Sequence, residues 1–254
     1  MLPFETTGEG PAVLLIMGLG LPGDAWWRTV PVLGRSLQVV TFDNRGAGRS
    51  ELPAGRLTLA GMAADAVSVL DTAEIARAHV YGISMGGMIA QELALRYPER
   101  VDALVLGATS AGGSAATPPD RETLAFLARR AAVPDEEGRW ASVPYVYSER
   151  TRGVGGARIG EDFARRRTYR FDPVGYGTQL AAAAAHDAAR RLGDIAAPTL
   201  IVHGAEDRMV PPANGRALAA AIPGSRLLEF DNAAHLYTTD EPAADEAVLE
   251  FLIG

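Results

Sequence analysis

Short apolar runs of four to six residues recur along the chain, and segments with helical periodicity lie between them. A continuous apolar run of this length favours a strand that is buried on both faces, because a half-exposed strand alternates apolar and polar residues. Parallel sheets covered by helices bury both faces in this way. The predicted strands are 12–17, 37–42, 79–83, 101–106, 199–202 and 225–230.

The helical segments complete the pattern. From Leu59 to Leu70, apolar residues recur at the i, i+3 and i+4 spacing of one helix face. Asp24 can cap a helix that ends near Leu33, and further helices are expected over 213–221 and 243–252. Strands that alternate with helices predict an α/β fold, with a mostly parallel sheet and helices on both of its faces.

The alternation stops between about residues 111 and 191. A segment rich in Gly, Ser, Thr and Pro, 112–119, leads into several helix-like pieces without a convincing strand. We interpret 112–191 as an inserted helical cap, and 1–111 with 192–254 as the core that carries it.

The predicted cap is rich in aromatic and basic residues. Its aromatic side chains either roof an apolar pocket or attach the cap to the core, and we select Trp140, Tyr145 and Tyr147 as pocket residues. The basic residues Arg165, Arg166, Arg167 and Arg170 favour a solvated helix face, with recognition of an anionic substrate group as the alternative. The cap's aromatic residues are Phe126, Trp140, Tyr145, Tyr147, Phe163, Tyr169, Phe171 and Tyr176.

Composition narrows the chemistry. The 254 residues carry a formal charge of −7, which argues against binding to nucleic acid or to an anionic membrane through a basic surface. The chain has no cysteine, and all of its 24 basic residues are arginine. Thiol nucleophiles, Cys-ligated metals, Schiff-base lysines and P-loop lysines are therefore excluded, and we expect no cofactor and no metal. No basic residue precedes the first apolar run and no run approaches membrane-spanning length, so a cytoplasmic location is expected.

A serine stands where a predicted strand meets a predicted helix. The sequence Gly-Ile-Ser-Met-Gly, residues 82–86, follows the strand directly and opens an apolar helix that runs to about Tyr97. A serine on such a tight turn stands clear of the sheet, and glycines two positions before and after it let strand and helix pass closely. This nucleophile elbow makes Ser84 the candidate catalytic nucleophile.

An acid and a histidine follow in the order that a Ser-Asp-His triad needs. Asp207 lies in the polar loop after strand 199–202, with Glu206 as its main rival. His235 lies in a loop of small residues after the last strand. The other three histidines are set aside, because His79 lies at the opposite end of its strand, His186 lies in the cap, and His203 closes a strand where a local hydrogen bond is expected. We assign Ser84 as nucleophile, His235 as general base and Asp207 as the group that orients it.

The tetrahedral intermediate of such a reaction needs hydrogen-bond donors for its oxyanion. The backbone N–H of Met85 follows the nucleophile at a helix N-terminus, and the loop after the first parallel strand offers that of Leu19. Backbone donors do not depend on side-chain identity, so apolar residues can serve.

These motifs together resemble the α/β-hydrolase family, in particular its capped esterase, lactonase and enol-lactonase-like members. The resemblance covers nearly the whole chain and is weakest through the cap. It includes the glycine-rich loop 18–23 and the turn Asp-Asn-Arg-Gly-Ala-Gly-Arg-Ser, residues 43–50, which is similar to the D-x-R-G-x-G-x-S turn of the family. Met17 departs from the histidine that many relatives have before the oxyanion glycine, whereas Ser84 disfavours the members with an aspartate nucleophile.

The same glycine-rich loop also supports a competing interpretation. Residues 18–23 match G-x-G-x-x-G after a strand, and Asp43 follows at the spacing of a dinucleotide-binding fingerprint. Pro22 and Asp24, however, predict that the helix starts beyond the glycines, where its N-terminus cannot meet a pyrophosphate. We therefore disfavour NAD or NADP as a ligand.

The sequence thus predicts a cofactor-independent serine hydrolase that cleaves a carboxylic ester or lactone of a small, largely apolar molecule. Two alternatives remain open: the same triad used for hydrolysis of a carbon–carbon bond or for perhydrolysis, and a hydrolase-like protein that binds a ligand without turnover. A small-molecule substrate is the expected partner, with association into a homo-oligomer left open.

Overall fold

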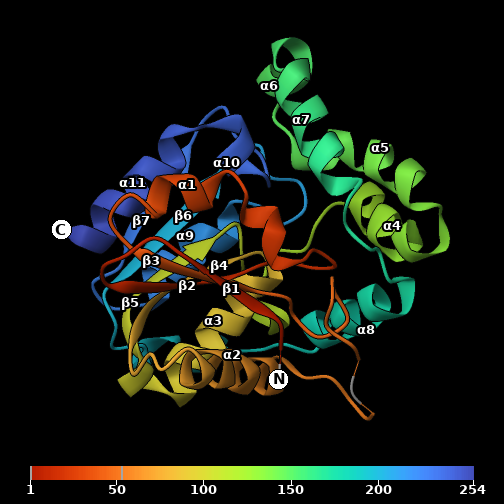
Figure 1. The fold of residues 1–254 in the computed structure, drawn as a ribbon. Helices are drawn as coiled ribbons and strands as arrows, with labels where there is room; N and C mark the ends of the chain where they lie inside the picture. The colour runs from red at the N-terminus through yellow and green to blue at the C-terminus, as the bar shows by residue number, and fades with distance from the viewer. Residues whose placement is uncertain (1, 53) are drawn as a thin grey trace.

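The computed structural model describes residues 2–52 and 54–254, which form a seven-stranded sheet with helices on both faces and further helices beside it (Figure 1). The strand order is β1-β3-β2-β4-β5-β6-β7. Strands β2 to β7 are parallel, and β1 pairs antiparallel with β3 at the edge. The strands are β1 (Phe4–Thr7), β2 (Ala12–Ile16), β3 (Gln38–Phe42), β4 (Ala78–Ile83), β5 (Val101–Gly107), β6 (Thr199–Gly204) and β7 (Arg226–Phe230).

The six predicted strands are confirmed, with ends that differ by one or two residues. The additional strand, β1, has a mostly exposed and polar sequence, Phe-Glu-Thr-Thr, because it lies at the sheet edge and pairs on one side only. An edge strand of this kind gives no apolar run for a sequence pattern to detect.

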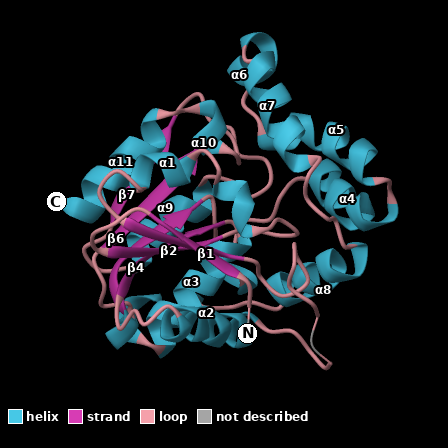
Figure 2. Ribbon diagram, in the orientation of Figure 1, coloured by secondary structure: helices cyan, strands magenta, loops and turns pink. Residues whose placement is uncertain are grey.

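Alternate residues of the central strands pack into two separate cores. Val13 and Leu15 of β2 belong to one apolar cluster, and Leu14 and Ile16 belong to the other. The second cluster includes residues of α2 (Leu59–Thr72), α3 (Met85–Arg96) and α9 (Ala213–Ala221), whereas the first includes residues of α1 (Thr29–Leu33) and α11 (Ala243–Ile253). Figure 2 shows α2 and α3 on one face of the sheet and α1 and α11 on the other. The predicted α/β-hydrolase fold is confirmed.

Four predicted helices, α2, α3, α9 and α11, are found with nearly the expected bounds, but the helix expected from Asp24 is wrong. Asp24 lies inside a short 3₁₀ helix, η1 (Gly23–Trp26), and a separate helix, α1, begins at Thr29. Pro31 has no N–H to donate to the carbonyl of Trp27, so a continuous helix would lack a hydrogen bond at this point. The remaining short helices are η2 (Pro98–Arg100), η3 (Gly113–Ala115), η4 (Arg130–Ala132), η5 (Ala189–Asp194) and α10 (Tyr237–Asp240).

The segment between β5 and β6 contains the helices expected for a cap. Helices α4 to α7 stand away from the sheet, and α8 lies closer to it (Figure 1). The cap has a small apolar cluster of its own, which includes Phe126, Tyr145, Tyr147 and Phe163. The bounds are α4 (Arg121–Arg129), α5 (Asp135–Val146), α6 (Glu149–Val154), α7 (Gly156–Arg166) and α8 (Pro173–Ala184). The division of the chain at 112 and 191 into core and cap stays a prediction.

Within the part of the chain that the structure describes, no helix has both the length and the apolar character needed to cross a lipid bilayer.

Candidate active site

Ser84 joins β4 to α3 through a strained backbone conformation. Its φ of 58° and ψ of −124° lie in a region that residues other than glycine rarely adopt. The Ser84 N–H donates to the carbonyl of Gly107 at 2.8 Å, and the Ser84 carbonyl accepts from the hydroxyl of Thr109 at 2.7 Å. These bonds to the end of β5 and the residues after it hold the corner in its strained conformation.

The two glycines of the elbow make this corner possible. A Cβ atom at Gly82 would lie 2.2 Å from the carbonyl oxygen of Gly86, and a Cβ atom at Gly86 would lie 2.0 Å from that of Ile16. Helix α3 therefore crosses β4 and β2 at a distance that only glycine permits at both positions, as the sequence predicts.

The structure brings His235 and Asp207 together from loops that follow β7 and β6. His235 Nδ1 lies 2.8 Å from Asp207 Oδ2, and both side chains are buried. The rival acid, Glu206, is engaged elsewhere, because its carboxylate accepts the backbone N–H of Glu149 at the start of α6 at 2.6 Å. Asp207 is therefore the carboxylate that can orient the imidazole.

Asp207 accepts several hydrogen bonds besides that from His235. Its Oδ1 accepts the backbone N–H groups of Met209 and Val210 at 2.8 and 2.9 Å. Burial by itself raises the pKa of Asp207, but the charge of His235 and the hydrogen bonds from His203 and His235 lower that pKa below its ordinary value. The ionised carboxylate holds the proton of His235 on Nδ1, which leaves Nε2 to act as a base.

His203 contributes to this arrangement in a way that the sequence did not predict. The expected local bond is present, because Nε2 lies 2.8 Å from the carbonyl oxygen of Val210. A carbonyl can only accept, so Nε2 carries the hydrogen. The same nitrogen lies 3.4 Å from Asp207 Oδ2, and both side chains are fully buried. The spacing of four residues between His203 and Asp207, at the end of a buried strand, is the signal that could have indicated this contact.

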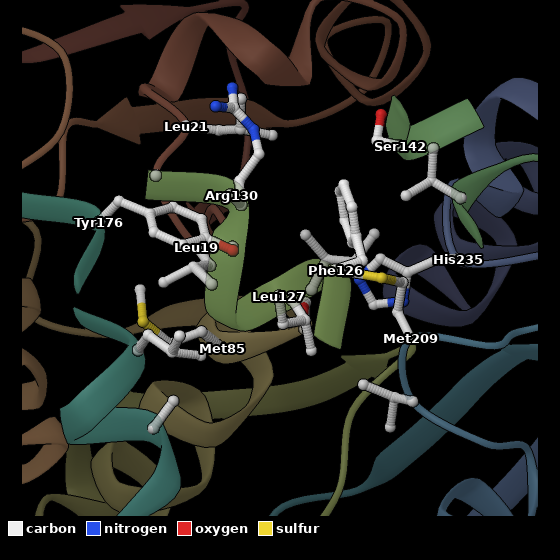
Figure 3. Close-up of a pocket in the computed structure, with 18 of the residues that line it drawn as sticks. Leu19, Leu21, Met85, Phe126, Leu127, Arg130, Ser142, Tyr176, Met209 and His235 are labelled. Carbon is white, nitrogen blue, oxygen red and sulfur yellow. The ribbon is translucent and has the colours of Figure 1, made fainter. Parts of the chain in front are cut away.

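Ser84 and His235 line one cavity of about 360 Å³. Figure 3 shows the His235 ring beside Met209 and Phe126 on the cavity wall. Among the described residues, no direct hydrogen bond joins the Ser84 hydroxyl to His235. Proton transfer therefore needs a change in the distance or the alignment of the two groups, as in many enzymes whose catalytic hydrogen bond is completed when substrate binds.

The residues predicted to form the oxyanion hole, Leu19 and Met85, line the same cavity (Figure 3). Met85 is the first residue of α3, and the first N–H groups of a helix have no partner within the helix. The loop of Leu19 also passes close to the nucleophile, because a Cβ atom at Gly18 would lie 3.7 Å from Ser84 Oγ. The assignment of the Leu19 and Met85 N–H groups as donors stays a prediction.

Two buried amide side chains, neither of which the sequence singled out, hold the loop after β2. Asn44 Nδ2 donates to the carbonyl of Met17 at 2.8 Å. Gln179 on α8 accepts the N–H of Gly20 at 2.7 Å and donates to the carbonyl of Arg45 at 2.7 Å. Asn44 lies within the turn 43–50, so the motif could have indicated a role, whereas nothing in the local sequence of α8 marks Gln179.

The turn 43–50 also removes the basis of the dinucleotide interpretation. Asp43 is buried, and its Oδ1 accepts the N–H of Gly23 at 2.8 Å. Its Oδ2 accepts two hydrogen bonds from Arg49, both at 2.9 Å. The carboxylate therefore organises the glycine-rich loop and has no free oxygen for a ribose.

The predicted pocket residues of the cap are corrected by the structure, because Trp140, Tyr145 and Tyr147 do not line the cavity. Trp140 is 59% exposed at the surface, Tyr145 stacks on Phe126, and the buried hydroxyl of Tyr147 donates to Asp162 at 3.0 Å. Composition identifies an aromatic segment but not the direction in which each ring points. The aromatic residues that line the cavity are Phe126, Tyr169, Phe171 and Tyr176.

An elbow serine, a buried Asp-His pair and a capped cavity at one end of a parallel sheet define the architecture of a hydrolase. Residues 11–242 match the family model described as "alpha/beta hydrolase fold", and the chain belongs to that family. It is a hydrolase of the α/β-hydrolase fold, related to proteins with several different activities.

Three relatives show this range. The chain is 33% identical to a protein of Mycobacterium tuberculosis that carries the provisional name non-heme bromoperoxidase BpoC, over 98% of this chain and 97% of the relative. It is 30% identical to a poly(3-hydroxyalkanoate) depolymerase of Ectopseudomonas oleovorans, over 94% and 83% of the two chains. The crystal structure of the enol-lactonase from Burkholderia xenovorans LB400 is similar, with a TM-score of 0.87, 27% identity and coverage of 100% and 96%.

Proposed function

We propose that this protein is a serine hydrolase that cleaves carboxylic esters or lactones through an acyl-enzyme, with Ser84, His235 and Asp207 as its triad. The observation that carries the proposal is the placement of Ser84, on its strained corner, in the same cavity as an imidazole whose Nδ1 is held by a buried carboxylate. The enol-lactonase and depolymerase relatives support the same reaction type.

In the proposed first half-reaction, His235 Nε2 takes the Ser84 proton as Oγ attacks the carbonyl carbon. The oxyanion that forms accepts hydrogen bonds from the N–H groups of Leu19 and Met85. The intermediate collapses, the carbon–oxygen bond to the leaving group breaks, and His235 returns its proton to the departing alkoxide. In a lactone this alkoxide remains part of the acyl group.

In the second half-reaction, water takes the place of the leaving alcohol. His235 removes a proton from water, the resulting oxygen attacks the acyl carbon, and the acid leaves as Ser84 recovers its proton. Asp207 stays ionised throughout and stabilises the imidazolium in both steps.

A substrate panel tests the proposal. Purified protein, with no metal or cofactor added, is assayed on p-nitrophenyl esters, lactones and a β-diketone. Ser84→Ala is expected to lower turnover by about 10⁴ to 10⁶-fold. Ser142, a second serine that lines the cavity, is the matched control, because Ser142→Ala removes a hydroxyl that is not on the elbow.

A covalent probe gives an independent readout. A fluorophosphonate is expected to add once to the wild-type protein, at Ser84, and not to Ser84→Ala. Hydrolysis by Ser84→Ala at nearly the wild-type rate would remove Ser84 from the mechanism. Binding without turnover and without an adduct would instead indicate a ligand-binding protein.

The bromoperoxidase name of one relative favours a second candidate, perhydrolysis by the same triad. Here hydrogen peroxide replaces water as acceptor, and the acyl-enzyme yields a peracid. Peracid formation from an ester and peroxide, lost in Ser84→Ala, would support this candidate. Hydrolysis that peroxide does not divert would contradict it.

A further inference from the structure

The cavity wall that the cap supplies is strongly basic. Among the residues that the structure describes, four arginines line it, Arg130, Arg139, Arg166 and Arg170, and Asp135 is the one Asp or Glu. The formal charge of these five side chains is about +3, while the whole chain carries −7. Positive charge is therefore concentrated at the cavity wall, although the protein as a whole is acidic, and the overall composition does not explain this concentration.

The single carboxylate is shared. Asp135 accepts from Arg130 Nη2 at 2.5 Å and also pairs with Arg139. Both arginine side chains are only 11% and 12% exposed, so two largely buried cations have one anion between them. Withdrawing a cation from water without a matching anion is costly, and a bound anion would offset that cost.

The other two arginines have no carboxylate partner in the part of the chain that the structure describes. No Asp or Glu oxygen lies within 4.0 Å of the guanidinium groups of Arg166 and Arg170. Their neighbours Arg165 and Arg167 are exposed and do not line the cavity. The solvated-face interpretation of this arginine cluster therefore fits Arg165 and Arg167, whereas Arg166, which is partly buried, and Arg170, which is exposed, both line the cavity.

An aromatic wall connects the basic region to the catalytic loop. The guanidinium of Arg130 stacks over the ring of Phe171 at 4.0 Å, and the Phe171 and Tyr176 ring centroids lie 5.7 Å apart. Tyr176 packs in turn on the loop after β2, because its ring lies 2.9 Å from the Cβ position of Gly20. In Figure 3, Arg130 and His235 stand on different walls of the cavity. A ligand that reaches from Ser84 to Arg130 would thus pass along an apolar surface.

We propose that the physiological substrate carries a carboxylate at the end of an apolar acyl chain, and that the cap arginines bind this carboxylate while Ser84 attacks the ester or lactone carbonyl. This proposal rests on the proposed hydrolase function. Guanidinium groups fit a carboxylate with two parallel hydrogen bonds, so they select for it over a neutral chain end. The substrate class is therefore the monoester of a dicarboxylic acid or the lactone of a hydroxy-dicarboxylic acid.

Two esters of equal chain length test this selection. p-Nitrophenyl hydrogen suberate and p-nitrophenyl octanoate share an eight-carbon acyl chain and differ in the terminal carboxylate. The measured quantity is the ratio of kcat/KM for the suberate ester to that for the octanoate ester. We expect the wild-type ratio to exceed ten, the effect of at least one charge-assisted hydrogen bond.

Substitution of the arginines should remove the preference. Arg130→Gln and Arg166→Gln are each expected to lower the ratio at least tenfold, and Arg166→Lys is expected to retain part of it. Arg129→Gln and Arg167→Gln are matched controls, because these exposed arginines adjoin the two test positions but do not line the cavity, and they are expected to keep the wild-type ratio. Arg166 lies outside the Asp135 ion pairs, so its variants remain informative if Arg130→Gln fails to fold.

The outcomes separate this inference from the function on which it rests. Octanoate hydrolysis that depends on Ser84, with a wild-type ratio near one or with equal losses on both esters in the arginine variants, would overturn the carboxylate proposal and leave the hydrolase intact. Absence of turnover on both esters and lactones, together with an unlabelled Ser84, would overturn the proposed function itself.

Discussion

Asp245 on α11 is a carboxyl group in an apolar setting, and its ionisation should control stability. Its side chain is 2% exposed, and its one hydrogen-bond partner among the described residues is the hydroxyl of Thr29 on α1, at 3.0 and 3.1 Å from the two oxygens. Burial raises the pKa of Asp245 from its ordinary 3.8 to about 7, although the bond from Thr29 opposes the change.

The direction of the pH effect follows from this pKa. Between pH 4 and pH 7 the folded protein keeps the proton that the unfolded chain has lost, so stability falls as the pH rises through this range. The gap between 3.8 and about 7 corresponds to about 4 kcal/mol of stability that is absent above pH 7.

Asp245→Asn removes the ionisation and keeps an oxygen that can accept from Thr29. The free energy of unfolding of the variant, relative to wild type, should therefore increase by about 3 kcal/mol between pH 5 and pH 8. Urea unfolding followed by tryptophan fluorescence at both values measures this change. Glu250→Gln alters an exposed carboxyl on the same helix and should give a difference that varies little with pH. Equal differences for Asp245→Asn at the two pH values would refute the reasoning.

Three further predictions concern the catalytic site. Gly82→Ala introduces a Cβ atom 2.2 Å from the carbonyl oxygen of Gly86, so it should lower stability by about 2 kcal/mol or more and abolish turnover. Thermal unfolding and ester assays measure these effects, and a fully active, stable variant would contradict the close approach of helix and strand. His203→Phe removes a hydrogen-bond donor to Asp207, and this loss should raise the pKa of the Asp207 carboxyl. The low-pH limb of the kcat/KM profile should therefore move to higher pH. An unchanged profile would assign His203 a purely structural role. Gln179→Ala frees the loop after β2 and should lower kcat about tenfold. An unchanged kcat in this variant would count against the role of Gln179 in holding the loop.

Most of the sheet could be predicted from the sequence, because strands buried on both faces produce continuous apolar runs. β1 produces none, since it lies half-exposed at the edge and pairs antiparallel. The helix expected from Asp24 overlooked Pro31, which cannot continue a helical hydrogen-bond pattern. The periodicity of the local sequence predicts the buried strands and most helices. The missed strand β1 depends on its position at the sheet edge, and the wrong helix depends on the N–H group that Pro31 lacks.

The site was predictable to the extent that its residues occupy fixed places in the fold. Asp207 and His235 follow parallel strands whose carboxyl ends meet, and the structure joins them as the order along the chain predicts. The cap offers no such rule, so the selection of Trp140 among its aromatic residues was wrong. The contribution of Gln179 depends on how α8 meets the core, which is a tertiary contact without a local signal.

The hydrogen bonds of Gln179 have a consequence for how such proteins diversify. The side-chain amide of Gln179 on α8 forms hydrogen bonds to both the glycine-rich loop and the neighbouring turn. A shift of α8 would therefore also move the loop that borders Ser84. A chimaera that exchanges the insertion for that of a relative should therefore disturb the glycine-rich loop, whose Leu19 N–H we propose as an oxyanion donor, as well as the cavity wall. Transplants that carry this glutamine in register should retain turnover more often than those that omit it.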